Sequence, residues 1–154
     1  MNLKYYNLPF GAQLLLWTSR VFFHGSCRLK PNKYELVDLA YAKVGIENGA
    51  RLLRQYLYLL RIKTDFQPQS ICKQVLSEQE IKLINCIEEH KKINFDNCTY
   101  INFWNLYNSE KLFTKGAKNL ALAFKKANLN TNIEFLKNVN NAKENLNSFY
   151  KTLH

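Results

Sequence analysis

The sequence has few residues that interrupt regular structure, with five glycines and three prolines among 154 residues. These residues sit where helices would begin or end, and no alternating strand pattern with turn signals competes with them. No internal repeat of roughly 20 to 50 residues is visible. The scarcity of turn-forming residues therefore favours an all-α fold.

The sequence also lacks an apolar run long enough to span a bilayer. Its most apolar segment, residues 8–23, is interrupted by polar side chains and is shorter than the roughly 20 residues that a spanning helix requires. We predict that this segment is a buried core helix. The chain does not open with a charged start, an apolar core and a small-residue cleavage site, so we expect no signal peptide and a cytoplasmic location.

The four cysteines lie far apart and form no C-x-x-C pair. Cys86 and His90 are four residues apart on a predicted helix and could share a metal, with Cys72 before that helix and Cys98 after it. These spacings match no zinc signature, and a buried cysteine behaves as a small hydrophobic residue. We therefore expect reduced thiols, no metal site and no cofactor.

No catalytic motif stands out in the sequence. Glu88 and Glu89 are adjacent, so their side chains diverge around a helix, and no serine or cysteine stands in a recognisable order with a histidine. No glycine-rich loop could cradle a phosphate. We expect a binding protein rather than an enzyme; a pocket built without a local motif is the enzymatic alternative.

Apolar side chains, in contrast, are abundant: 47% of the residues are hydrophobic and 14% are aromatic, too many for a disordered chain. A chain of this length can bury roughly 70% of its unfolded surface in a single domain. Apolar residues recur at helical spacing between start and stop signals. The predicted helices cover about residues 9–24, 32–44, 48–63, 78–92, 109–127 and 133 onward, while residues 94–108 fit either a short helix or an irregular connection.

The clearest start signal is Ser77-Glu78-Gln79-Glu80, a capping box in which Ser77 and Glu80 can satisfy each other's backbone amides. Short connections between successive helices imply that neighbours run in opposite directions. The sequence thus predicts an all-α, single-domain antiparallel bundle of six to seven helices over residues 1–154.

The formal charge of +10, from 22 basic and 12 acidic residues, would attract nucleic acid, an anionic membrane or an acidic protein. A drift of the whole genome toward lysine codons would produce the same total without a functional cause. Such a drift does not explain arginine, which suits bidentate recognition of phosphate or carboxylate. All arginines lie in the first half of the chain, at Arg20, Arg28, Arg51, Arg54 and Arg61.

Three of these arginines share one predicted helix with a tyrosine. Arg51, Arg54, Tyr58 and Arg61, here called the Arg/Tyr stripe, follow one another at helical spacing beside a leucine stripe. The helix can therefore dock by its leucines and present three guanidinium groups outward. We predict that the Arg/Tyr stripe binds an acidic surface of a partner protein, because tyrosine and arginine are enriched at binding hot spots.

Two other interpretations of the Arg/Tyr stripe remain open. Residues 38–60 have helix-turn-helix character around Gly45, which would make the protein a nucleic-acid-binding regulator that uses the same arginines. The stripe could also be a solvated face whose arginine stems cover apolar neighbours. The sequence leaves the partner and the oligomeric state undetermined.

A second polar line, Gln13, Arg20 and His24, runs along the otherwise apolar first helix. A charge at that position needs a partner when it is buried. Asp38 or Glu35 could supply it from the next helix. We therefore expect a structural pair, and a ligand pocket around these three residues is the alternative.

Overall fold

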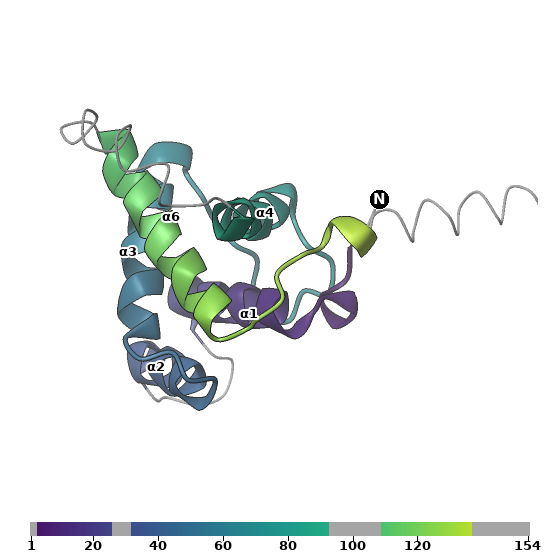
Figure 1. Cartoon of the computed structure of the whole chain (residues 1–154). Coiled ribbons are helices and arrows are strands. Elements are labelled where there is room, and N and C mark those ends of the chain that lie inside the picture. Colours follow the sequence, from purple (N-terminus) through teal and green to yellow (C-terminus); the bar gives the residue numbers. More distant parts are fainter. Residues whose placement is uncertain (1–2, 26–31, 93–108, 137–154) are drawn as a thin grey trace, which may run out of the picture.

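The computed structural model describes residues 3–25, 32–92 and 109–136, with the backbone alone for residues 109–114. In this part of the chain the elements are a short 3₁₀-helix η1 and five α-helices, which pack together as one bundle (Figure 1). Their bounds are η1 Tyr5–Asn7, α1 Phe10–His24, α2 Lys33–Lys43, α3 Gly49–Thr64, α4 Glu78–Lys92 and α6 Ser109–Lys126. The predicted all-α bundle is thereby confirmed.

Local signals fix the helix ends. Ser77 Oγ accepts a hydrogen bond from the Glu80 amide at 3.2 Å, and Glu80 Oε1 accepts one from the Ser77 amide at 3.0 Å, so the capping box forms as predicted. Gly25 and Gly45 follow the ends of α1 and α2 with φ of 73° and 85°, a region that glycine enters without steric cost.

The core lies where α1, α3, α4 and α6 meet. Helix α6 packs against α3 and α4, and it runs in the opposite direction to α3, while α1 packs against α2, α3 and α4 (Figure 1). Helix α1 is buried on most sides, as expected from its nearly continuous apolar sequence. The fully buried apolar side chains of α3 and α6 include Leu53, Tyr56, Leu120 and Phe124.

The N-terminal segment is tied to the connection between α3 and α4. Lys4 and Val75 form an isolated antiparallel bridge, with the Tyr5 amide donating to the Gln74 carbonyl at 2.7 Å and the Leu76 amide donating to the Leu3 carbonyl at 2.9 Å. These bonds join the segment before α1 to the segment before α4.

No helix among the described residues is both long enough and apolar enough to span a membrane. Several predictions fall outside the described residues. These are the aromatic connection at 94–108, with Cys98, most of the predicted last helix, of which only residues 134–136 are seen as helical, and Arg28.

Candidate functional site

Helix α3 carries the Arg/Tyr stripe on its outward side. The helix contains three arginines and one lysine and no acidic residue. Arg51, Arg54, Tyr58 and Arg61 are all exposed, whereas the opposite side of the helix is buried against α1, α2 and α6. Because residues three or four apart lie on one side of a helix, burying the leucines turns the stripe outward.

The stripe surrounds an exposed apolar ridge. Tyr58 is 65% exposed and Ile62, four residues further on, is 63% exposed. Tyrosine and arginine together are enriched at binding hot spots, while single exposed apolar side chains also occur on surfaces that bind nothing. Tyr58 is the centre of the ridge, with Arg54 and Arg61 about one turn away on either side along the helix.

An open groove of about 590 Å³ lies beside the stripe, between the end of α1, the start of α2 and α3. We call it the aromatic groove. The rings of Phe22 and Tyr34 pack at its base with centroids 6.3 Å apart and planes inclined by 59°. Its described lining contains three cations and no carboxylate: Phe22, Phe23, Asn32, Lys33, Tyr34, Arg54, Leu57, Tyr58 and Arg61.

A smaller groove of about 350 Å³ lies on the other side of Tyr58, between α3 and α6. Its described lining adds Leu59, Lys115, Gly116 and Asn119 to Gln55 and Tyr58. Tyr58 therefore stands between two recesses, and a partner seated on the stripe can contact both.

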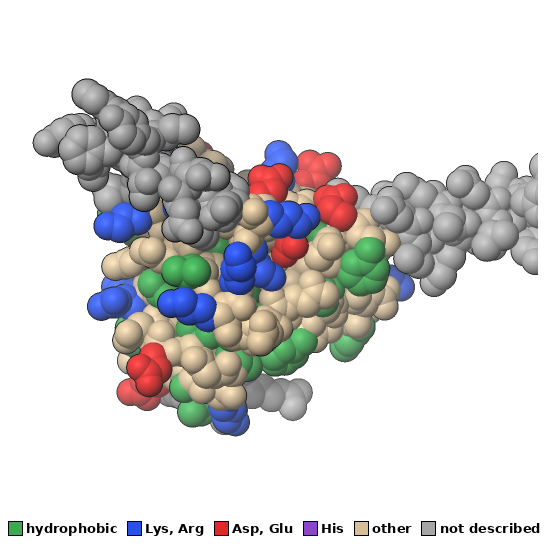
Figure 2. Space-filling model, viewed as in Figure 1, with side chains coloured by type: hydrophobic (Ala, Val, Ile, Leu, Met, Phe, Trp, Pro, Cys, Tyr) green, Lys and Arg blue, Asp and Glu red, His purple; other side chains and the backbone are tan. Residues whose placement is uncertain are grey.

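Charge is distributed unevenly over the surface. In the space-filling view, lysine and arginine side chains without acidic neighbours lie over α3 and α6, whereas near α4 and at the edge near α2 acidic and basic side chains occur together (Figure 2). No carboxylate of the described residues forms an ion pair with Arg51, Arg54 or Arg61. Arg61 also lies in the last turn of α3, where a cation favours the helix dipole.

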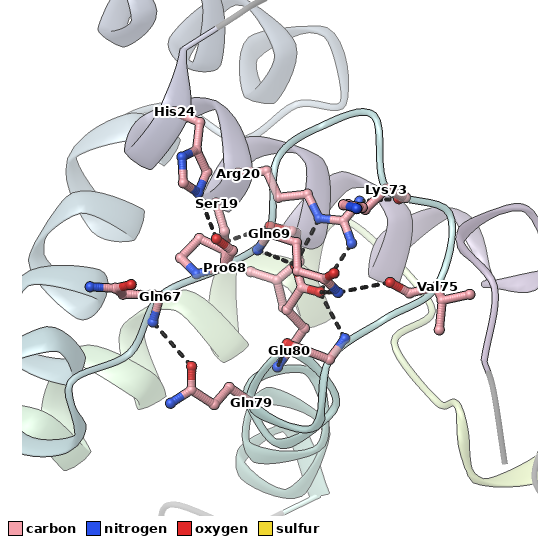
Figure 3. A network of polar contacts seen from close by, with 12 residues as sticks. Ser19, Arg20, His24, Gln67, Pro68, Gln69, Lys73, Val75, Gln79 and Glu80 are labelled. Atoms are coloured by element: carbon pink, nitrogen blue, oxygen red, sulfur yellow. Dashed lines mark hydrogen bonds and ion pairs between the residues drawn. The ribbon is translucent and has the colours of Figure 1, made fainter.

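The second polar line has a structural partner (Figure 3). Arg20 is 1% exposed, and its Nε and Nη2 donate to the two carboxylate oxygens of Glu80 at 2.7 and 3.0 Å. Its Nη1 donates to the Lys73 carbonyl at 2.7 Å. The expectation that Asp38 or Glu35 would supply this carboxylate was wrong.

The physical reason is the direction that the polar side of α1 faces. Its polar line meets the connection between α3 and α4, and not α2, whose Glu35 and Asp38 are exposed. His24 Nε2 lies 2.6 Å from the Pro68 carbonyl, and Gln13 Nε2 donates to the Tyr5 carbonyl at 3.1 Å. Gln13, Arg20 and His24 thus hold two connecting segments onto α1, an arrangement that favours the structural role over a ligand pocket.

Burial alone would raise the pKa of Glu80. Hydrogen bonds from Arg20, from the Ser77 amide and from Gln69 outweigh that effect and lower the pKa of Glu80 below its ordinary value. Gln69 contributes its side-chain amide at 3.0 Å and its backbone amide at 3.3 Å. Glu80 therefore stays ionised inside the fold.

Cys86 and His90 meet on α4. His90 Nδ1 lies 2.7 Å from the Cys86 carbonyl and 3.7 Å from Cys86 Sγ. The hydrogen bond with Cys86 raises the pKa of His90, against an opposing effect of burial. Within the described ranges, no group of three or more histidine, cysteine or acidic side chains is placed to hold a metal ion.

The aromatic groove went unnoticed in the sequence. Phe22 and Phe23 end one helix, and Lys33 and Tyr34 begin the next after a short connection. Adjacent helix ends joined by a short connection must lie close together, which is the signal that could have drawn attention to them. These four residues lie beside Arg54 and Arg61 because of the way α3 packs, which no local sequence pattern predicts.

No protein-family model, curated protein sequence or solved structure matches this chain. The fold and the site define an all-α bundle with a basic, aromatic-lined surface. The function is therefore argued from the chemistry of that surface.

Proposed function

We propose that this protein binds an acidic surface of a partner protein through the Arg/Tyr stripe, Arg51, Arg54, Tyr58 and Arg61. The observation that carries the proposal is the outward side of α3, where three arginines surround an exposed tyrosine on a helix without a single carboxylate. Guanidinium groups match carboxylates in bidentate geometry, and a neighbouring tyrosine supplies apolar contact area at low entropic cost.

The arrangement of α3 favours a protein partner over duplex DNA. A recognition helix presents polar side chains to the base edges of the major groove. Helix α3 is packed against α1, α2 and α6, and the side that remains carries Tyr58 and Ile62 as bulky apolar groups. The test below therefore includes a nuclease treatment, which detects binding to nucleic acid.

The test compares two charge-reversed forms of the full chain. Arg51→Glu/Arg54→Glu/Arg61→Glu changes the stripe, and Lys82→Glu/Lys125→Glu/Lys126→Glu changes three exposed lysines on α4 and α6 by the same total charge. Affinity capture from cell extract, at low and high salt and with and without nuclease, is followed by titration of the recovered partner. We expect the arginine variant to lose a saturable, nuclease-resistant acidic protein that the lysine variant retains.

Equal loss in both variants would show that net charge alone attracts the partner, and the proposal would fail. If the partner is no longer recovered after nuclease treatment, the ligand of the Arg/Tyr stripe is nucleic acid and not a protein. Circular dichroism of both variants checks that each remains helical.

A further inference from the structure

We infer that the aromatic groove receives a bulky apolar side chain from an extended acidic segment of the partner, while two carboxylates of that segment meet Arg54 and Arg61. The inference rests on the proposed function and specifies which kind of segment the stripe recognises. Arg54, Tyr58 and Arg61 belong to both the stripe and the groove lining, so one partner segment can engage both.

Part of the groove lining is apolar and packs against the core. Leu57 is a buried member of the core, and Phe22, Phe23 and Tyr34 are half-buried against that core. A volume of about 590 Å³ lies within the range of roughly 300 to 1,000 Å³ that is usual for ligand sites. A partner side chain that enters it gains apolar contact with these half-buried rings.

The cations at the groove select an acidic segment. Lys33 Nζ donates to the Phe22 carbonyl at 2.8 Å, which holds this ammonium group near the end of α1. Arg54 and Arg61, exposed on α3, have no such contact to the backbone among the described residues and can turn toward a ligand. A neutral apolar ligand would bring these guanidinium groups close to an apolar surface without a counter-charge, which is unfavourable. A ligand that carries carboxylates beside its apolar group satisfies both parts of the lining.

The spacing of the arginines sets the spacing of the carboxylates. Arg54 and Arg61 are seven residues apart on α3, which corresponds to about 10 Å along the helix axis. In an extended polyproline II segment, side chains three residues apart lie on one side and are about 9 Å apart. We therefore expect a segment with two acidic residues about three positions apart and a large apolar residue between them. With three residues per turn, that apolar side chain leaves the segment on a different side and can enter the groove beside α3.

A single-stranded nucleic acid fits the groove less well. Base stacking needs an open ring face. Phe22 and Tyr34 pack against each other and are half-buried, so Tyr58 is the exposed aromatic ring among the described lining residues. Nucleic-acid binding is nevertheless measured as a separate arm of the test.

The experiment selects a random dodecapeptide display library on the purified full chain and measures the affinity of the enriched peptides. Enriched sequences should share two acidic residues three positions apart with a large apolar residue between them. We expect Arg54→Glu/Arg61→Glu and Tyr34→Ala each to weaken binding at least about tenfold, the effect of losing a hot-spot contact. Leu39→Ala, which truncates an exposed apolar side chain elsewhere on α2, should leave the affinity unchanged.

A second measurement needs no variant and therefore does not depend on how Tyr34→Ala folds. Addition of a selected peptide to the wild-type chain should shift the NMR signals of Phe22, Tyr34 and Tyr58. Peptide-induced shifts that spare these three residues would overturn the inference.

The outcomes separate the two proposals. If acidic peptides without an apolar residue are enriched, and their binding is insensitive to Tyr34→Ala, the groove inference fails and the Arg/Tyr stripe stands. If no acidic peptide is enriched, or charge reversal has no effect, both fail. An oligothymidine that binds through Arg54 and Arg61 where no peptide does would also overturn the inference.

Discussion

At the level of single residues, the contact between Arg20 and Glu80 joins α1 to α4 inside the fold. Both side chains are buried, and the guanidinium group contacts both carboxylate oxygens. A buried pair of this kind adds little net stability when it is compared with apolar side chains of the same volume, but removing one partner leaves an uncompensated charge. The pair therefore specifies how the connection between α3 and α4 sits on α1.

Arg20→Ala should lower the free energy of unfolding by about 3 to 5 kcal/mol near neutral pH, because Glu80 would remain buried without its cation. Urea unfolding followed by circular dichroism measures this change. The control is the double variant Arg20→Met/Glu80→Gln, which removes both charges but keeps a side-chain oxygen that can accept from the Ser77 and Gln69 amides. It should lose less than Arg20→Ala. A loss in the double variant as large as that in Arg20→Ala would contradict this account.

The same pair predicts how stability depends on pH. The pKa of Glu80 is lowered in the folded state, so its contribution is complete above the unfolded value of about 4.3 and is lost as the pH falls through the lower folded value. In Arg20→Ala the cation that lowers this pKa is missing, so the pKa of Glu80 lies higher than in the wild type and protonation at low pH costs the variant less stability. The stability difference between wild type and Arg20→Ala should therefore narrow from neutral pH to about pH 3; a constant difference would exclude the mechanism.

At the level of helices, Gly49 and Gly116 show the difference between helix propensity and the packing of neighbouring helices. Glycine in a helix interior costs about 1 kcal/mol relative to alanine, so helix preference predicts that Gly116→Ala, inside α6, stabilises the protein. Gly49 is the first residue of α3, where the gain from alanine is smaller. A Cβ at Gly49 would collide with Cβ and Cγ of the buried Tyr41, whereas a Cβ at Gly116 would meet its neighbours at 3.7 to 3.8 Å, an ordinary contact. Close approach of α3 to α2 thus requires Gly49.

The two substitutions should have opposite effects. We expect Gly49→Ala to destabilise the protein by more than about 1 kcal/mol, since an overpacked core forces its neighbours to shift. Gly116→Ala should stabilise it by roughly 0.5 to 1 kcal/mol. Thermal unfolding of both variants measures this, and stabilisation by Gly49→Ala would show that α2 and α3 can separate without cost.

At the level of the whole molecule, net charge and surface shape should contribute differently to the proposed binding of an acidic partner. The excess of +10 acts over the distance that salt permits, about 10 Å at moderate ionic strength. The Arg/Tyr stripe and the aromatic groove act only on contact. Raising the salt should therefore slow the association of a selected acidic peptide more than it speeds dissociation, because steering is screened and the apolar contact is not. Surface plasmon resonance at several salt concentrations separates the two rates, and a salt effect confined to dissociation would argue against steering by the net charge.

The sequence anticipated what depends on neighbours within one or two turns. The capping box at Ser77 and Glu80 and the glycine after α1 lie within such a span, as does the outward direction of Arg51, Arg54 and Arg61 on their own helix. Helical periodicity alone relates these residues to each other. Whether the Arg/Tyr stripe binds a partner stays a prediction.

Tertiary structure alone decided which helices meet. Glu80 appeared in the sequence only as a cap, and it became the partner of Arg20 because α4 and the connection before it pack on α1. Phe22 and Tyr34 came to lie beside Arg54 and Arg61 in the same way, through the packing of α3 on two earlier helices. Packing angles between helices depend on the summed fit of many side chains distant in sequence. The periodicity of apolar residues within one helix therefore cannot predict how that helix packs against the others.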